Sequence, residues 1–583
     1  MKYISVIAVV AGLVLLNSCN ESFLEITPNG ALDEAVLATY EGVDALLISA
    51  YAMIDGTAAD VAGWSAASSN WVLGSVRAAE SNKGSDSVTS PTSTPSRPTR
   101  KLPPTATWMP RASVYEGISL ANKAINVAIK AMDAGSITSE EYDRIVAQAR
   151  ALRGIYHFEA FRAFGKLTDG TGIPYLNEET DYATVTNTED VRASIIADLQ
   201  AGIALPNDMG QIGRVNKTVM QVFTAKAMMQ MNHDYAGALP LLQAAENGTN
   251  PVGDAVGLMD NYGEIFDAAN RNDIEAVYTI QYSVNDNSGG WNAGYGEVLN
   301  FPYKGGGSPG GCCGFFQPSQ DFVNSFRTDA SGLPLIDLAA QTYSYQDELV
   351  SNDFGVAIDD ATYTEYAGNL DPRVDWSAGR RGIPYWDWGP HTGQDWVRDQ
   401  SYAGPYSPKK QVYQKSQEGT LTEVGNWTSG YTANGYRLIR YADVLLLKAE
   451  CEAMTNADDL GFGEVNDIRA RAANSFVYED DGVTPAANYV IAEYPTAWTT
   501  QAEAMHAIKF ERKLELGQEG HRFWDLQRWG EVVTEINRVL DFEKTMPWGG
   551  SLYGGATVGA EDVNYPVPQR QIDLTQGLIQ QNR

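Results

Sequence analysis

The chain has 583 residues, of which 44% are hydrophobic, and it contains 30 Tyr and 13 Trp. This composition is typical of a globular protein with a large core. Its 73 acidic and 42 basic side chains give a formal net charge of −31. Such a charge argues against nucleic acid or an anionic membrane surface as a partner and, more weakly, against a strongly anionic ligand.

The sequence pattern of residues 1–18 predicts a lipoprotein signal peptide. Lys2 is followed by an apolar stretch over residues 4–16, which is too short to span a bilayer as a helix. The run Leu-Asn-Ser-Cys that ends at Cys19 has the form of a lipobox. Cleavage before Cys19 and acylation of its thiol would anchor the mature chain by lipid. An ordinary secretory signal cut elsewhere is the alternative.

The first half of the chain is dominated by the periodicity of amphipathic helices. Helices are expected over residues 38–55, 112–132, 139–164, 189–203, 216–232 and 235–246. The first two are separated by a long irregular segment, residues 62–108. Loops of this length are usually functional or disordered, so we expect a recognition part near 64–88 and a mobile Pro/Ser/Thr-rich tip near 89–106.

From about residue 272 to 436 the pattern changes to Gly- and aromatic-rich loops. A short strand is expected over residues 275–282 and one helix near 318–327. Helix returns from Tyr436 and again near 464–473. A further amphipathic helix is expected, with Met505 and Ile508 on its apolar face. Gly517 and Gly520 are expected to end this helix by adopting positive φ. Another amphipathic run follows from Trp529 to Leu540.

Four sequence runs, in the same order along the chain, resemble the SusD/RagB family. They are residues 150–165, 437–450, 565–574 and the signature Glu-Gly-His-Arg-Phe-Trp-Asp-Leu-Gln-Arg-Trp-Gly, 519–530. Within the signature, His521, Arg522 and Asp525 are interpreted as a polar lock of the fold. The resemblance implies a mainly α fold: a tetratricopeptide-like helical-repeat scaffold with an irregular, loop-rich middle region and a few short strands. It divides the mature chain into residues 19–271 and 272–583.

The resemblance also implies a function. Family members are lipid-anchored glycan-binding proteins of the cell outer membrane, and they sit as hinged lids on SusC-like TonB-dependent β-barrel transporters. We therefore expect a surface-exposed binder, not an enzyme, that captures an oligo- or polysaccharide for such a transporter. No cofactor and no metal are expected. A glycoside hydrolase and a ligand-blind lid subunit remain the two alternatives.

Neutral sugars need aromatic rings against their C–H faces and planar polar groups for their hydroxyls, carried on supported loops. Three clusters offer these residue types. The first is Trp64, Trp71, Arg77 and Asp86; the second is Trp291, Asn292 and Tyr295; the third is Trp386, Asp387 and Trp388. Strand-like alternation in the third would place both Trp on one face and Asp387 on the other. For any single Trp, a role in the core is the alternative.

Two of the four cysteines, Cys312 and Cys313, are adjacent in a Gly-rich loop. A trans peptide holds neighbouring Cα atoms ~3.8 Å apart, below the usual disulfide range. A vicinal disulfide would therefore be strained, although export makes oxidation plausible. Both a disulfide and free thiols stay open. Cys451, within a predicted helix, is expected to be a small buried hydrophobe.

Overall fold

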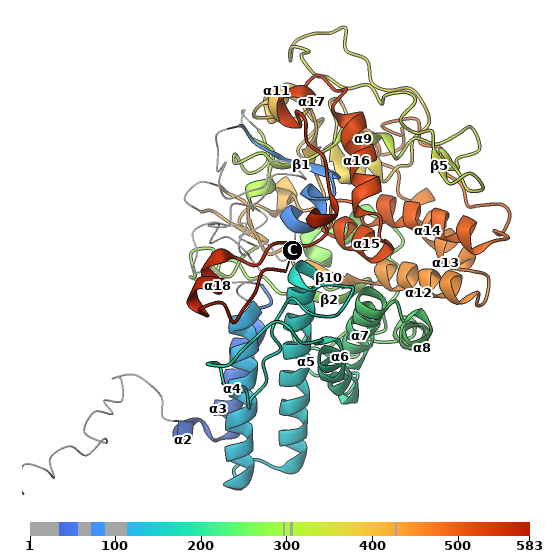
Figure 1. Cartoon of the computed structure of the whole chain (residues 1–583). Coiled ribbons are helices and arrows are strands. Elements are labelled where there is room, and N and C mark those ends of the chain that lie inside the picture. Colours follow the sequence, from blue (N-terminus) through green and yellow to red (C-terminus); the bar gives the residue numbers. More distant parts are fainter. Residues whose placement is uncertain are drawn as a thin grey trace, which may run out of the picture.

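The computed structural model describes residues 34–55, 71–87, 114–294, 298–303, 307–425 and 428–582 (Figure 1). Several predictions lie outside the described residues: the signal peptide with Cys19, the candidate site residues Trp64 and Tyr295, and the segment 89–106. Among the residues described, no helix is both long and apolar enough to cross a membrane.

The first half of the chain folds into helices that pack side by side in chain order. They are α2 (Glu34–Leu37), α3 (Tyr40–Ala52), α4 (Val114–Asp133), α5 (Ser139–Phe164), α6 (Arg192–Ala201), α7 (Lys217–Asn232) and α8 (Tyr235–Glu246). α3 packs on α4, α4 on α5, α5 on α6 and α7 on α8, which forms a curved row of helical hairpins (Figure 1). Every helix predicted in this region is present.

Local sequence fixes where these helices begin and turn. Thr138 caps α5 in a capping box, because its hydroxyl accepts from Glu141 N and the Glu141 carboxylate accepts from Thr138 N. Between α7 and α8 the chain reverses within two residues. His233 takes a left-handed conformation, with φ 51°, and the Asp234 side chain accepts from Gly237 N. These signals position the α7–α8 hairpin that the sequence predicts.

The last third returns to helix, as expected. Its longer helices are α12 (Tyr441–Thr455), α13 (Phe462–Ala473), α14 (Gln501–Glu515), α15 (Arg522–Trp529) and α16 (Val532–Glu543). Short helices are α9 (Gln320–Asn324), α10 (Val374–Ser377), α11 (Gln400–Ala403), α17 (Gly549–Leu552) and α18 (Gln569–Leu574). α12 packs on α8, so the first row of helices continues into the last third. The largest core accordingly runs from Val43 to Tyr565. The division at residue 272 stays a prediction.

The strands are short and form antiparallel pairs in the described part of the chain. The pairs join β1 (Ser81–Gly84) to β3 (Phe315–Pro318), β2 (Ala276–Ile280) to β10 (Tyr436–Arg440), β4 (Ile336–Asp337) to β5 (Thr342–Tyr343), β6 (Ala378–Gly379) to β7 (Ser407–Pro408), and β8 (Thr422–Glu423) to β9 (Tyr431–Thr432). Helices with small strand pairs match the predicted mainly α fold.

The start of the last third was predicted wrongly as helix. Tyr436 faces Ile280 and Arg440 faces Ala276 in the β10–β2 ladder, so residues 436–440 are a strand. α12 begins only at Tyr441. A tertiary pairing partner overrides the helical spacing of Leu438 and Tyr441, which helical periodicity alone cannot reveal.

Residues 71–87 are also different from the exposed recognition loop that the sequence suggests. Trp71–Val76 form a short π-helix, and the four residues of β1 are all buried. This segment packs against the signature: a Cβ on Gly74 would lie 1.9 Å from the Gly520 carbonyl oxygen. The segment is therefore a structural part of the core.

Two glycines after α14, Gly517 and Gly520, were expected to adopt positive φ, and only Gly520 does so. Gly520 has φ 77°, but the other positive φ belongs to Gln518, at 67°. Glycine is required at position 517 for a steric reason, because a Cβ there would lie 2.3 Å from the Phe322 ring.

Candidate functional site

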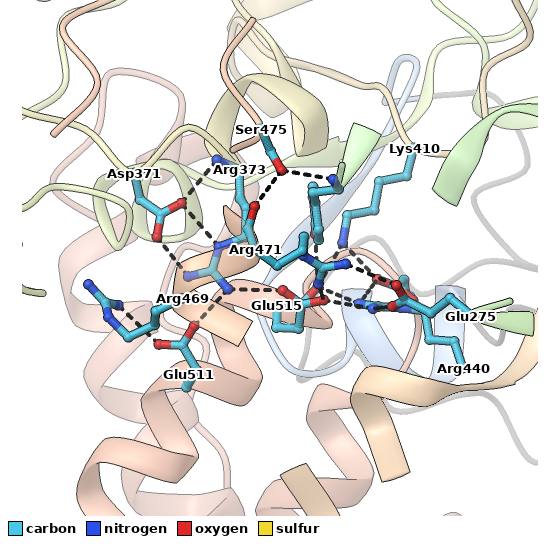
Figure 2. A network of polar contacts seen from close by, with 12 residues as sticks. Glu275, Asp371, Arg373, Lys410, Arg440, Arg469, Arg471, Ser475, Glu511 and Glu515 are labelled. Carbon is cyan, nitrogen blue, oxygen red and sulfur yellow. Dashed lines mark hydrogen bonds and ion pairs between the residues drawn. The ribbon is translucent and has the colours of Figure 1, made fainter. Parts of the chain in front are cut away.

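A buried, charge-balanced ionic network surrounds the end of α14 (Figure 2). Glu515 alone pairs with Arg373 at 2.9 Å, Arg440 at 2.7 Å and Arg471 at 2.5 Å. Glu275 bridges Arg440 and Arg471, at 2.6 and 2.9 Å. The network contains five cations, Arg373, Lys410, Arg440, Arg469 and Arg471, and five carboxylates, Glu275, Asp371, Glu511, Glu515 and Glu519. It joins strand β10, helices α13 and α14 and the middle region.

This network holds two of its carboxylates, Glu515 and Glu519, ionised. Burial alone would raise the pKa of Glu515, but Arg471, Arg440 and Arg373 outweigh it and hold the pKa well below its usual range. The pKa of Glu519 falls to about 2, since Arg440 and Lys410 likewise outweigh the effect of burial. Because each of these buried charges is paired, the residues act as a structural lock.

The signature residues belong to an adjoining part of the same lock. Asp525 accepts from Arg512 through both oxygens at 2.9 Å and from Arg528 at 2.9 Å. Arg522 pairs with Glu535 at 3.1 Å. Burial lowers the pKa of His521 to about 4, which keeps its imidazole neutral. Arg522 and Asp525 are therefore buried in α15, a short helix that the sequence did not separate, and the partly buried His521 directly precedes it.

Two of the three predicted aromatic clusters are carried by loops that pack on one shared core. This core consists of Ala293, Val298, Phe301, Tyr385, Trp396, Val412, Tyr413 and Tyr431, with Val284, Trp386 and Trp388 packed against it. The loop carrying Trp291 and the hairpin carrying Trp386 thus pack on the same core, although they are far apart in sequence.

A hollow of about 410 Å³ opens beside the hairpin. Its walls include the indoles of Trp376 and Trp386, whose ring centroids lie 5.4 Å apart, and the exposed ring of Tyr478. Planar polar groups line it as well: Asn261, Glu264, Asp267, Asp387 and Gln414. Aromatic faces with amide and carboxylate groups are the combination that sugar rings and their hydroxyls require.

Buried groups hold the two indoles of the hollow in place. Trp376 Nε1 donates to the Ser475 carbonyl at 2.6 Å, and Trp386 Nε1 donates to the Lys409 carbonyl at 3.2 Å. The Lys409 ammonium lies 4.9 Å from the centroid of Trp376 and 5.7 Å from that of Trp386. Burial lowers the pKa of Lys409 to about 7. Since the indole N–H groups are used internally, the rings can offer a ligand only their faces and edges.

The third predicted cluster forms a tight turn instead of an alternating strand. Trp388 N donates to the Tyr385 carbonyl at 3.1 Å, and Trp386 has φ 51°. The two Trp side chains therefore do not share one face: Trp386 packs on Trp376, whereas Trp388 packs on Tyr413 and donates to its carbonyl at 2.9 Å. Asp387 reaches the hollow while its oxygens accept from Lys415 N at 2.5 Å and Ser416 N at 2.8 Å.

The second cluster contains the most exposed tryptophan of the described residues. The side chain of Trp291 is 47% exposed at the end of a compact loop. Asn292 Nδ2 donates to Asp286 at 2.8 Å, and Asn285 N donates to Glu423 at 2.8 Å, which ties the loop to strand β8. A large ring on a loop held by such bonds is suited to ligand contact.

In the described part of the chain, the side chains of the first cluster make contacts within the protein. Trp71 is fully buried against Phe315 and Phe316, so the prediction of ligand contact is wrong for this residue. The Arg77 guanidinium lies 3.9 Å above the Tyr565 ring and donates to the Asp562 carbonyl. Asp86 pairs with Arg398 at 2.8 Å. These side chains serve the packing of β1 and the C-terminal segment.

The cysteine loop packs beside this buried segment. Cys312 and Cys313 are joined by a disulfide, and Cys313 contacts the core that contains Trp71 and Phe315. Cys451 is free and fully buried in α12, next to Met229.

Of the residues that line the hollow, only Trp386 and Asp387 were predicted from the sequence, and Trp376, Gln414 and Tyr478 are among those that were not. Trp376 lies only ten residues before Trp386, which is a weak signal. Tyr478 and Gln414 come from segments whose arrival at the hollow depends on the whole fold.

A curved row of helical hairpins followed by a loop-rich middle region defines the class of helical-repeat proteins. Comparisons with known proteins agree. The profile of the SusD family matches residues 274–583, more than half of the chain. The chain belongs to the SusD family.

One curated relative and several solved structures, each with low sequence identity, are similar to this chain. SusD-like protein P25 of Formosa agariphila is 22% identical over 466 residues, which cover 78% of this chain and 75% of that protein. Surface glycan-binding protein A from Bacteroides fluxus is 17% identical, with a TM-score of 0.65 over 93% of this chain and 99% of the other. Surface glycan-binding protein A from Bacteroides thetaiotaomicron, solved in complex with laminarihexaose, is 17% identical with a TM-score of 0.62 over the same shares.

Proposed function

We propose that this chain is a cell-surface glycan-binding lipoprotein, anchored in the outer membrane through Cys19. In this proposal it captures an oligo- or polysaccharide and delivers it to a TonB-dependent transporter. The observation that carries the proposal is the hollow between Trp376, Trp386 and Tyr478, with planar polar groups around it. Trp291 offers a further exposed ring on another loop that packs on the same core. Structural relatives named for laminarin and glycan binding support the choice of ligand class.

Direct binding is the first test. The full-length protein, purified in mild detergent, should be retarded in affinity gels that contain one of a panel of neutral glycans, laminarin included. Trp291→Ala and Tyr478→Ala should each weaken retardation and leave the melting temperature unchanged, because both rings are about half exposed, at 47% and 44%. Tyr182→Ala is the matched control, since Tyr182 is 59% exposed and lies in another part of the molecule.

The same experiment separates the alternatives. Release of new reducing ends from a bound glycan over a long incubation would identify a hydrolase. Failure to bind across the panel, or binding that both variants leave unchanged, would contradict the glycan site. A protein that still co-purifies with a transporter in that case would be a ligand-blind lid.

The transporter partner needs its own test. A tag at the C-terminus is a poor choice, because Asn582 is buried and donates to the carbonyls of Phe164 and Tyr565. An affinity tag inserted at Gly482, in the exposed turn with Val483, avoids this contact. Extraction of native membranes in mild detergent should recover a large outer-membrane barrel with the tagged chain. Recovery of the chain alone would refute the partner.

A further inference from the structure

The connection between α12 and α13 gathers acidic side chains around one point. Glu452 lies near the end of α12, Glu464 lies in the first turn of α13, and Asp459 lies in the loop between them. One carboxylate oxygen from each of the three residues lies within 4.8 Å of the other two. Oxygens that share one Ca²⁺, bound at about 2.3–2.6 Å, are separated by at most about 5 Å.

A second observation points to a missing partner at this place. Glu452 is only 1% exposed, yet its Oε2 accepts no hydrogen bond from any residue that the structure describes. The same holds for Oε2 of Glu464, which is 9% exposed. A buried carboxylate oxygen without a partner is costly, so native proteins normally supply one.

The cation already present does not balance these charges. Lys448 reaches Glu464 at 2.5 Å, Glu246 at 3.0 Å and Glu452 at 3.5 Å, so one ammonium serves three carboxylates. Together with Asp459, four negative charges face one positive charge, a net charge of −3. A divalent ion would reduce it to −1.

The loop geometry also suits a cation that enters from solvent. Asp459 is exposed, and its two oxygens accept from Phe462 N at 3.0 Å and Gly463 N at 2.9 Å. These bonds fix the carboxylate above the two buried glutamates, and each oxygen retains a further lone pair. The donors are all hard carboxylate oxygens, which favour Ca²⁺ over Zn²⁺ or copper.

We propose that Glu452, Asp459 and Glu464 form a calcium site that fastens the α12–α13 hairpin, with water completing the coordination. No metal was expected from the sequence, and the site lies outside the glycan hollow. Its role is structural: the ion joins the two helices, and Lys448 joins them to Glu246 of α8. Three side-chain ligands at a partly open site predict a dissociation constant of about 10⁻⁴ M.

Calorimetric titration of CaCl₂ into the full chain, stripped with EDTA, tests the proposal. We expect one site, and a melting temperature about 2 °C higher at a hundredfold excess over the dissociation constant. Glu452→Gln and Asp459→Asn should each weaken binding at least tenfold and remove the calcium-dependent rise in melting temperature. Asp337→Asn is the matched control. Asp337 is likewise exposed and accepts from two backbone N–H groups, but it lies outside the cluster.

Two results would overturn the calcium site. The first is no heat and no change in melting temperature up to 10 mM, a concentration about a hundredfold above the expected dissociation constant. The second is undiminished binding in Glu452→Gln and Asp459→Asn. If Glu452→Gln does not fold, Asp459→Asn at the exposed position decides alone. Glycan binding by the wild-type protein is measured separately, so failure of the metal site and failure of the glycan site are distinguishable.

Discussion

Replacement of Glu515 by glutamine should destabilise the fold while leaving glycan binding intact. Glu515 is fully buried and pairs with Arg373, Arg440 and Arg471. Glutamine keeps the shape but removes the charge, so the balanced network of five cations and five carboxylates becomes +1. Loss of one partner from a buried ion pair typically costs about 3–5 kcal/mol.

The arrangement of the network places the expected cost at the lower end of that range. Arg373 keeps Asp371 and Glu511, and Arg440 keeps Glu275 and Glu519. We therefore expect about 3 kcal/mol. With an unfolding entropy of about 2 cal/mol/K per residue, this corresponds to a melting temperature about 3 °C lower for a chain of this length.

Differential scanning calorimetry and denaturant titration measure this change. Glu531→Gln is the matched control, because the same substitution there breaks only a surface pair, with Lys509 at 2.6 Å. Its expected cost is below about 1 kcal/mol. Equal effects of the two variants would refute the structural lock. Loss of glycan binding by Glu515→Gln with unchanged melting would instead place a ligand at the network.

Three further predictions concern packing and pH. Gly74→Ala should cost at least about 3 kcal/mol, since its Cβ would strike the Gly520 carbonyl, whereas Gly550→Ala, with open space around it, should be neutral in thermal melts. Trp71→Ala should cost about 3–5 kcal/mol by calorimetry, because the buried ring leaves a cavity. Below pH 4.5 stability should fall: the folded pKa of Glu519 is about 2 against an ordinary 4.5, so its contribution of about 3 kcal/mol is present above pH 4.5 and lost toward pH 2.

Each of these predictions has a contradicting result. Equal melting of the two glycine variants would refute the close approach of the π-helix to the signature. If Trp71→Ala left the stability unchanged and reduced glycan binding, Trp71 would be a ligand-contacting residue and not a core residue. Melting that is unchanged between pH 6 and pH 3 would mean that the paired carboxylates do not have depressed pKa values.

Local signals explain why much of the helical scaffold could be predicted. The capping box at Thr138 and the regular apolar spacing that follows it define α5 within the chain itself. Strand β10 could not be found in this way, because its conformation depends on pairing with β2, far away in sequence. Propensity and periodicity describe a segment, whereas such a partner is supplied by the fold.

The candidate site was predictable only in part, for the same reason. Loop context made Trp291 and Trp386 candidates, but the hollow also needs Trp376, Gln414 and Tyr478 from other segments. Trp71 was assigned to a surface loop because its burial depends on contacts with Phe315 and Phe316. Residue type indicates what a ring could bind, whereas packing decides whether it is accessible.

The most direct test of the glycan site is a calorimetric titration of the best-retained glycan into the wild-type protein and the double variant Trp291→Ala/Tyr478→Ala. Each lost aromatic contact should cost about 0.5–1.5 kcal/mol, so the double variant should bind about 5- to 150-fold more weakly. Its melting temperature should equal that of the wild type. Equal affinity of the two proteins for the glycan would contradict the central claim.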